Sequence, residues 1–466
     1  MIIAVELISV KEEIRMVNIA SCEVELNHMN NGMQRVLKDT MRIFREASEM
    51  VGSIVEERWD DVKCQDTSKD KLTYVESLIH TTKNNQADYP DFDKKFYKFP
   101  AYYRRSVINF VVGQVRSYHT RLDEYEERRY TAISSGKKFK ERRPTLNLNT
   151  AAFPSMYKDQ MYILDGTRLS LKVRIRNTWD WVEVSIPARD KKYLENKASC
   201  GKVCSPKLLY KFHKFYLSFP IEYGYAKFPE TPVDRQIMLA VDLGVNRGAV
   251  ASLMDSSGTI LGRFFDPFTS ERDQMNHLIN KIKRIQRATG TGNSLAAVYT
   301  KLNGVKTNYT RKLANWIASL ASTHHVYGVV LEYLGKMKGS RSARIHHWCR
   351  CRIRDMVKGM CFRNGIRTFL INPRNTSALA FDGSGKVERD KKNYSMCTFS
   401  TGKRYHCDLS ASYNIGARYF LRAYFKAMPE TEWSGLMAKV PELSKRTSWT
   451  LSTLIRVDSE FRKNAA

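Results

Sequence analysis

The chain has 466 residues, and 77 Lys and Arg against 48 Asp and Glu give it a formal net charge of +29 at pH 7. A content of 42% hydrophobic and 11% aromatic residues is enough for folded cores, which excludes a basic disordered tail as the whole protein. At roughly 150 residues per domain, the length suggests about three domains. A folded chain with this surplus of positive charge predicts a polyanionic partner, and nucleic acid is the first candidate.

The sequence carries no sign of a membrane or secreted protein. No stretch reaches the roughly 18 apolar residues of a membrane span, and the apolar start at 1–10 meets charged residues before any signal-peptide cleavage site. The nine cysteines are odd in number and scattered, which indicates reduced thiols. We therefore expect a cytoplasmic protein without a membrane partner, although a membrane surface is the competing polyanion on charge alone.

Helical spacing dominates the first quarter of the chain. Residues 17–26 alternate as in a strand, and apolar residues at three-to-four spacing over 33–59 and 104–128 predict two long helices. The polar stretch 64–99 between them is expected to be irregular. The segment 134–144 carries five Lys and Arg between a glycine and a proline, and is either a solvated linker or a contact to a nucleic-acid strand.

After residue 144, the spacing of the apolar residues changes to every second position. Alternating residues predict strands that form a small β domain, over 145–149, 161–175, 181–187 and 207–223. After a polar linker at 229–236, three short strands are predicted at 238–244, 249–255 and 259–265, followed by helices and strands in turn: helices near 270–288 and 306–324, a strand at 326–334, a helix near 342–364, a strand at 366–372 and a last helix after Asp408. Three antiparallel strands followed by helix-linked strands predict an RNase H-like α/β domain.

Three acidic residues stand at element ends in this last region: Asp242, Glu332 and Asp408. Singly, each has a structural explanation as a turn residue, a strand edge or a helix N-cap. Together they would converge from two central strands and a helix end. Clustered carboxylates need a cation, and hard oxygen ligands select Mg²⁺ or Mn²⁺, of which two ions can drive phosphodiester cleavage.

Several strings in this region resemble one known family. The strings VDLGVN (241–246), VVLEYL (329–334) and DLSASYNI (408–415) resemble, in order, the three motifs of the RuvC nuclease domain of TnpB proteins and compact type V CRISPR effectors. The resemblance covers about 236–421 strongly and the first half only in layout. It implies a multidomain α+β protein, with a helical recognition lobe inserted in an oligonucleotide-binding β-barrel and followed by an RNase H-like nuclease domain.

The domain boundaries that the resemblance implies can be given along the chain. They are a first wedge strand with an N-terminal extension at 1–30, a helical recognition domain at 31–135, the wedge β-barrel at 136–230, the first part of the RuvC domain at 236–375, a nucleic-acid-binding insert at 376–407, the last RuvC helix at 408–421 and a C-terminal tail at 422–466.

The insert departs from the family pattern. The family carries two Cys-x-x-Cys pairs that bind zinc, but the first pair falls here on Ala380 and Gly383. Zinc through Cys397, His406 and Cys407 lacks a fourth ligand, so no zinc is expected and the insert should be a metal-free, Lys-rich loop. Ser410 stands where the family has Asn, which puts a supporting hydrogen bond in doubt.

The resemblance implies an RNA-guided DNA endonuclease. Such a protein binds a structured guide RNA, recognises a short target-adjacent motif, and cleaves double-stranded target DNA, paired as an RNA–DNA heteroduplex, at one RuvC site with two Mg²⁺ (or Mn²⁺) ions. Asp242, Glu332 and Asp408 would be its catalytic metal ligands. It would act on the nucleoid in a prokaryotic cytoplasm, as a monomer or as a homodimer on one guide RNA.

Three alternatives stay open. They are an RNA-guided repressor that cuts little, a RuvC-type endonuclease that uses no RNA, and a strand-transfer transposase with a similar carboxylate triad. The basic residues expected to bind phosphates lie on the 104–128 helix, in the basic run, after Glu332 and in the insert. They are Arg104, Arg105, Arg116, Lys137, Lys138, Lys140, Arg142, Arg143, Arg341, Arg344, Arg350, Arg352, Lys391, Lys392, Lys403 and Arg404.

Overall fold

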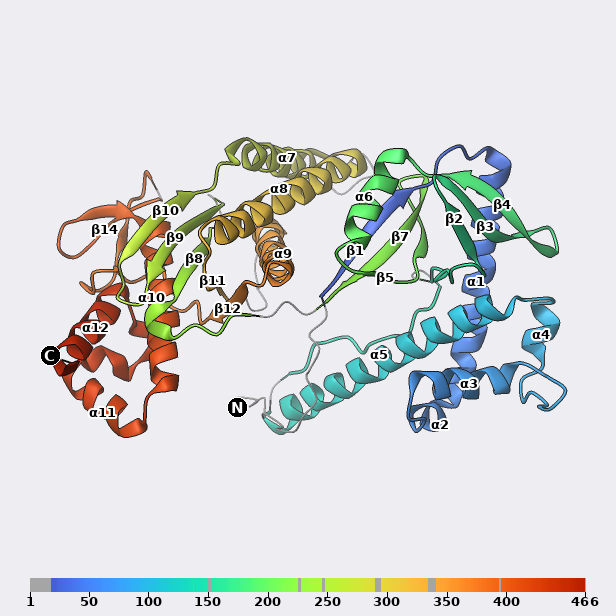
Figure 1. Cartoon of the computed structure of the whole chain (residues 1–466), viewed down its shortest axis with the longest axis horizontal. Helices are drawn as coiled ribbons and strands as arrows, with labels where there is room; N and C mark the ends of the chain where they lie inside the picture. The colour runs from blue at the N-terminus through green and yellow to red at the C-terminus, as the bar shows by residue number, and fades with distance from the viewer. Residues whose placement is uncertain are drawn as a thin grey trace. The chain divides into compact units, whose positions relative to one another are not determined.

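The computed structural model describes residues 18–465, apart from 137, 150–151, 225–227, 245–247, 290–294, 334–340 and 394 (Figure 1). For 289, 341–348, 464 and 465 it describes the backbone alone. The chain forms two compact units, Met1–Gly224 and Tyr225–Ala466. The predicted phosphate contact of Lys137 lies outside the described residues, and so do the side chains of Arg341 and Arg344.

Two long helices form the helical part of unit 1. Helix α1 (Asn31–Glu57) begins where the Asn30 side chain accepts a hydrogen bond of 2.8 Å from the Met33 N–H. It packs against α5 (Ala101–Ser134). Between them the chain forms α2 (Trp59–Lys63), α3 (Ser68–Ile79) and α4 (Asp91–Lys95). The expectation of irregular structure over 64–99 is wrong, because Thr67 and Asp70 form a capping box that starts α3.

The strands of unit 1 form two separate sheets. Strand β7 (Lys214–Tyr223) pairs with β1 (Asn18–Glu25), β5 (Lys202–Val203) and β6 (Lys207–Lys211). Strands β2 (Tyr162–Asp165), β3 (Arg168–Ile175) and β4 (Thr178–Ser185) form the second sheet, and helix α6 (Ala188–Ala198), which was not predicted, follows β4. The described residues therefore form no closed barrel.

The expected strand at 145–149 is not present. Its Leu148 packs against α1 so closely that a Cβ added at Gly52 would lie 1.9 Å from the Leu148 Cδ1 atom. The Asn149 side chain also donates a hydrogen bond of 2.7 Å to Glu49 on α1. The segment thus satisfies its apolar and polar groups on a helix, which its two-residue period alone did not reveal.

Unit 2 contains a five-stranded sheet with the order β10-β9-β8-β11-β12. Strands β8 (Ile237–Leu243), β9 (Ala249–Asp255) and β10 (Ile260–Phe265) are antiparallel, whereas β11 (Gly328–Glu332) runs parallel to both β8 and β12 (Arg367–Ile371). Helices α7 (Thr269–Thr289) and α8 (Ala296–Thr323) lead to β11, and α9 (Arg341–Arg363) leads to β12. These are the three antiparallel strands and two helix-linked strands that the sequence predicts.

Alternate residues of the central strand face different helices. Met238 and Ala240 of β8 share a core with α10 (Cys407–Ala427), α11 (Glu430–Lys439) and α12 (Leu451–Ala465). Leu239 and Val241 share the other core with α8 and α9. Short 3-10 turns lie at Val233–Arg235, Pro441–Ser444 and Arg446–Ser448. Helices α11 and α12 thus belong to the core on this side of the sheet (Figure 1).

The insert is a small sheet with its own core. Strands β13 (Glu388–Arg389), β14 (Met396–Thr398) and β15 (Arg404–His406) pair antiparallel. Ala380, which occupies a zinc-ligand position of the resembled family, is buried together with Cys397, Phe399 and Cys407. An apolar cluster therefore fills the centre of this sheet. No helix in the described part of the chain is long and apolar enough to cross a bilayer.

Candidate active site

The strand register places Asp242 and Glu332 side by side. Val330 of β11 is level with Ala240 of β8 in a parallel pair, so Glu332, two residues further on, is level with Asp242. Since side chains alternate along a strand, both acids lie on the sheet face that carries Ala240 and Val330. This is the face covered by α10, whose first turn contains Asp408.

Burial and mutual repulsion shape the electrostatics of this pair. Asp242 is only 7% exposed. Its pKa is raised well above the ordinary value of 3.8, first by burial and then by the charges of Glu332 and Asp408. Burial also raises the pKa of Glu332, against a hydrogen bond from Thr376 and the charge of Arg350, which lower it. The three carboxylates are thus close enough to influence one another.

Asp408 is available for a ligand rather than used as a helix cap. The cap of α10 is His406, whose Nδ1 accepts a hydrogen bond of 3.3 Å from the Leu409 N–H. Asp408 follows in the first turn, where the helix dipole favours a negative charge. The N-cap explanation of this aspartate is therefore wrong.

A buried side chain on α10 holds the segment that orients Glu332. Thr376 is 2% exposed, and its hydroxyl donates a hydrogen bond of 2.6 Å to the Glu332 Oε1 atom. The fully buried Asn414 amide donates to the carbonyls of Thr376 (3.0 Å) and Leu379 (2.9 Å), and its oxygen accepts from the Leu451 N–H (3.2 Å). Asn414 thus ties α10, the 376–379 segment and the start of α12 together, a role that its place in a motif string could only hint at.

Arg418 is a second residue that sequence reasoning missed. It lies one turn further along α10, is 5% exposed, and donates to four backbone carbonyls at 2.7–3.1 Å. Burial lowers its pKa to about 10, while the charge of Glu332 acts to raise it. Its acceptors are the carbonyls of Asn372, Arg374, Thr447 and Trp449. Arg418 therefore fixes the segment after β12 and places a positive charge near Glu332.

Asp266, directly after β10, is the centre of a buried hydrogen-bond network. Asp266 accepts hydrogen bonds from the Tyr309 hydroxyl (3.1 Å) and the Phe268 N–H (2.7 Å), and pairs with Arg272 at 3.2 Å. A Cβ added at Gly248, where φ is +75°, would lie 1.6 Å from the Asp266 Oδ2 atom. Only glycine fits there, so the network restricts residue 248, immediately before β9, to glycine.

The donor set suits a hard divalent cation, but the described side chains do not form a closed metal site. Carboxylate oxygens are the ligands that Mg²⁺ and Mn²⁺ prefer, and no described residue donates a hydrogen bond to Asp242. A cation would offset the burial that raises the pKa of Asp242 and Glu332, and the repulsion that also raises that of Asp242. Among the residues described, however, no three His, Cys, Asp or Glu side chains stand in a metal-binding arrangement.

The basic residues expected to bind nucleic acid fall in different settings. Arg104, which was expected to bind phosphate and therefore to lie on the surface, is only 6% exposed and pairs with Glu76 at 3.0 Å, so its charge is used inside the helical bundle. Arg105 pairs with the same carboxylate at 3.6 Å, and Arg404 pairs with Asp390 at 2.9 Å. Arg350 and Arg352 are half-buried. The fully exposed ones are Arg116, Lys138, Lys140, Arg142, Arg143, Lys391, Lys392 and Lys403.

Comparisons with known proteins give one family match and several structural likenesses. A family model described as the Aq_aa04 family matches residues 20–175, about a third of the chain. No curated protein matches. Among solved structures, a Cas12f1-sgRNA-target DNA complex is 12% identical, with 78% of this chain and 91% of that chain covered and a TM-score of 0.38. The chain resembles compact type V CRISPR effectors.

Two further structures show the same kind of likeness. CasPhi-2 (Cas12j) bound to crRNA and phosphorothioate DNA is 10% identical over 86% of this chain and 91% of that chain, with a TM-score of 0.48. C2c1 of Alicyclobacillus acidoterrestris with single-guide RNA is 10% identical over 84% of this chain and 67% of that chain, with a TM-score of 0.38. At these identities, the chemistry of this chain has to be argued from its own residues.

Proposed function

We propose that this chain is an RNA-guided DNA endonuclease that cleaves target DNA at one RuvC-type site formed by Asp242, Glu332 and Asp408. The observation that carries the proposal is the placement of Asp242. It is buried, level with Glu332 on the neighbouring parallel strand, and close enough to Asp408 for both charges to raise its pKa. A protein without use for a cation at this point would gain stability from an apolar residue there.

The chain's own residues suit such a site. Asp242, Glu332 and Asp408 would hold two Mg²⁺ or Mn²⁺ ions, which activate water and stabilise the leaving oxygen of a phosphodiester when bound. Thr376 fixes the rotamer of Glu332 through its hydrogen bond, and Asn414 fixes Thr376. Arg350 adds a positive charge beside Asp242 and Glu332, where a scissile phosphate would approach.

The guided part of the proposal rests on charge and on the motif strings. A net charge of +29 needs a polyanion larger than one short DNA duplex, and a junction endonuclease needs little more than its nuclease domain. Unit 1 supplies exposed basic residues in Lys138, Lys140, Arg142 and Arg143. Guide RNA and target double-stranded DNA would be the partners. The boundaries of the recognition, wedge and RuvC parts that the motif resemblance implies are part of this proposal.

The first experiment is to express the protein with its native flanking DNA, sequence the RNA that copurifies, and assay cleavage of a matching DNA target. We expect Asp242→Asn, Glu332→Gln and Asp408→Asn each to lower cleavage by about a thousandfold, since they remove metal ligands, while binding of RNA and DNA stays near that of the wild type. Asp355→Asn, which changes an exposed carboxylate of the same unit, is the matched control.

Each other outcome selects a different function. Target binding without cleavage by the wild type would indicate a guided repressor. Cleavage of branched DNA without any RNA would indicate a RuvC-type endonuclease that needs no guide, and joined DNA products would indicate a transposase. Loss of RNA binding in the three variants would mean that the carboxylates are structural, and would overturn the proposed site.

A further inference from the structure

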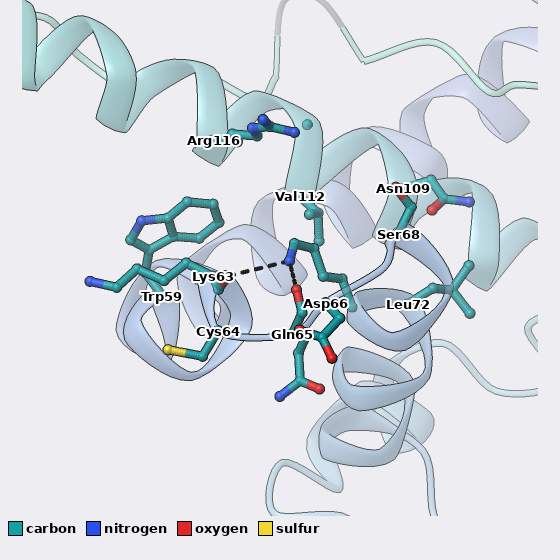
Figure 2. A pocket seen from close by; sticks show the side chains of 12 residues that line it. Trp59, Lys63, Cys64, Gln65, Asp66, Ser68, Leu72, Asn109, Val112 and Arg116 are labelled. Atoms are coloured by element: carbon teal, nitrogen blue, oxygen red, sulfur yellow. Dashed lines mark hydrogen bonds between the residues drawn. The ribbon is translucent and has the colours of Figure 1, made fainter. Parts of the chain in front are cut away.

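A cavity of about 520 Å³ opens in unit 1, between the α2–α3 connection and the middle of α5. Figure 2 shows Trp59, Lys63 and Cys64 on one side of it, Asn109 and Leu72 on the other, and Arg116 above them. The volume lies within the range of about 300–1,000 Å³ that is usual for small-molecule sites. The cavity belongs to the helical part of unit 1 and contains none of the carboxylates of the candidate active site.

The charges that line the cavity favour an anion. Three of the lining residues are basic, Lys63, Lys71 and Arg116, and one is acidic, Asp66. The Lys71 ammonium donates to the backbone carbonyls of Lys63 and Gln65, which orient it, and its charge also acts on Asp70. Lys63 is already paired with Asp60. Within the described part of the chain, no hydrogen bond or ion pair engages the Arg116 guanidinium. A phosphate could therefore contact both Lys71, whose orientation is fixed, and Arg116, whose guanidinium is not engaged.

An aromatic ring is held in place at the same cavity. The indole of Trp59 stacks on His119 with ring centroids 4.9 Å apart and planes 5° from parallel, and His119 in turn contacts the Glu56 carboxylate at 3.0 Å. His119 is not part of the cavity wall, whereas Trp59 is. The part of the indole that His119 does not cover therefore faces the cavity, and a fixed aromatic surface is what an unpaired base stacks on.

A glycine keeps the cavity open at a cost to the helix. Gly113 lies in the middle of α5, where glycine is less favourable than alanine by about 1 kcal/mol. A Cβ added there would meet no atom within 4 Å, so packing does not require glycine. Gly52 differs, because its Cβ would overlap Leu148. Gly113 is part of the cavity wall, so a large side chain at this position would extend into the cavity.

We propose that this cavity binds one unpaired nucleotide of a nucleic-acid strand, with the base against Trp59 and the phosphate held by Arg116 and Lys71. A free mononucleotide has the same chemistry as a nucleotide within a strand, so the test has to distinguish the two ligands. This inference goes beyond the proposed nuclease function and does not require it. The carboxylate variants leave the cavity intact, so the two proposals fail separately.

The test uses Cys64, an exposed thiol in the cavity wall, as the reporter. The full chain, freed of copurified RNA, is treated with iodoacetamide in the presence of a single-stranded oligonucleotide of about eight nucleotides, and modification at each cysteine is read by peptide mass spectrometry. Parallel samples receive a mononucleotide or a blunt duplex. Cys200 is also exposed and lies on the same unit outside the cavity, so it serves as the internal control.

We expect the single strand to protect Cys64 but not Cys200, and the duplex to protect far less. Gly113→Leu, which fills the cavity, and Arg116→Gln should each weaken the protection by about tenfold. The matched controls are Gly304→Leu, at another helix glycine whose Cβ would meet nothing, and Arg121→Gln on the same helix as Arg116. The melting temperature of Gly113→Leu checks that this variant folds, which we expect because a Cβ at this position meets no atom within 4 Å.

The remaining outcomes decide the source or overturn the inference. Equal protection by the mononucleotide would make a free nucleotide the ligand of the same site. Protection that the duplex gives as well as the strand, or that survives in Gly113→Leu, would show binding to an ordinary basic surface and overturn the proposal. Unchanged Cys64 modification while the oligonucleotide is bound would overturn it too.

Discussion

At the scale of single residues, the site is a balance between buried acids and the groups that hold them. Asp242 lies near the end of β8 on a hydrophobic sheet face, and its pKa is raised by burial and by two neighbouring carboxylates. The negative charge of Glu332 is stabilised by the hydrogen bond from Thr376 and by the charges of Arg350 and Arg418, which lower its pKa. This imbalance makes Asp242 the residue whose protonation state is most sensitive to a bound cation.

The raised pKa of Asp242 predicts a pH dependence of stability. In the metal-free protein, the folded state keeps the Asp242 proton above pH 3.8, where the unfolded chain begins to lose it. The free energy of unfolding therefore falls as pH rises from about 4 through the raised pKa. Asp242→Asn should remove this loss, so its gain in melting temperature over the wild type, measured with a chelator present, should widen from acid to neutral pH.

The exposed carboxylate of Asp355 provides the control for this measurement. Asp355→Asn should leave the melting temperature near that of the wild type at every pH. A difference between Asp242→Asn and the wild type that stays constant, or narrows, as pH rises would contradict the burial and repulsion that the structure shows.

The hydrogen bond from Thr376 to Glu332 predicts a specific effect on activity. Thr376→Val keeps the shape of the side chain but removes a hydrogen bond to a charged group, which is worth about 1.5–3 kcal/mol. We expect DNA cleavage to fall by about 10- to 100-fold with little change in DNA binding, and Thr376→Ser to retain most of the activity. Equal losses in both variants would show that the methyl group, rather than the hydroxyl, is what the site needs.

At the scale of elements, α10 organises unit 2. It carries Asp408 in its first turn, Asn414 in its middle and Arg418 one turn later, so one helix supplies a candidate ligand and both anchors of the segment that orients Glu332. Helix α12 packs against it and supplies the Leu451 N–H that donates to Asn414. The C-terminal residues are thus part of the support of the site.

The apolar core of the insert predicts that its fold does not depend on zinc. Ala380, Cys397, Phe399 and Cys407 are each at most 2% exposed, and burial raises the pKa of both thiols, which disfavours the thiolate that zinc requires. A strong zinc chelator should leave the melting temperature unchanged. Phe399→Ala should lower the stability by about 3–5 kcal/mol through the cavity it leaves.

The contrary result would be equally clear. A zinc-held sheet would unfold when the chelator is added, because structural zinc contributes about 10–16 kcal/mol to small domains. Elemental analysis of the purified protein is the second measurement, and one zinc ion per chain would contradict the apolar core as the main support of the insert.

At the scale of the whole molecule, the net charge governs how the affinity for nucleic acid depends on salt. The surplus of positive charge lies mostly in residues 225–466, and exposed basic residues such as Lys138 and Lys140 form no ion pair among the described residues. We expect the affinity for nucleic acid to fall by about a thousandfold between about 50 and 200 mM salt, since each phosphate contact releases counterions.

Filter binding over a range of salt concentrations tests this prediction. Replacing Lys138 and Lys140 together by Gln should lower the slope of log affinity against log salt by about one for each phosphate that the two lysines neutralise in the wild type. An unchanged slope would mean that this basic run is a solvated linker, which is the alternative that its sequence leaves open.

Local pattern was enough to predict most elements of unit 2 and the three acids of the candidate site. Strands β8 and β11 are short apolar runs in the sequence, and each acid stands at or next to the end of its run. The sequence also contains the capping box of Thr67 and Asp70, a helix-start signature within a stretch whose polar composition suggests irregular structure. The strand that the two-residue period predicts at 145–149 is not present. The same alternation also fits an extended segment that packs against a helix, as Leu148 does against α1.

The sequence by itself determined the charge, the periodicity of the strands and helices, and the acid at the end of each of three elements, because these depend on residues near one another in the chain. Only the tertiary structure decided that Arg104 meets Glu76, that Asn414 reaches Thr376, and that Trp59 and Arg116 share a cavity. These contacts join residues 28 to 57 positions apart, and the path of the backbone between them, rather than any local preference, brings them together.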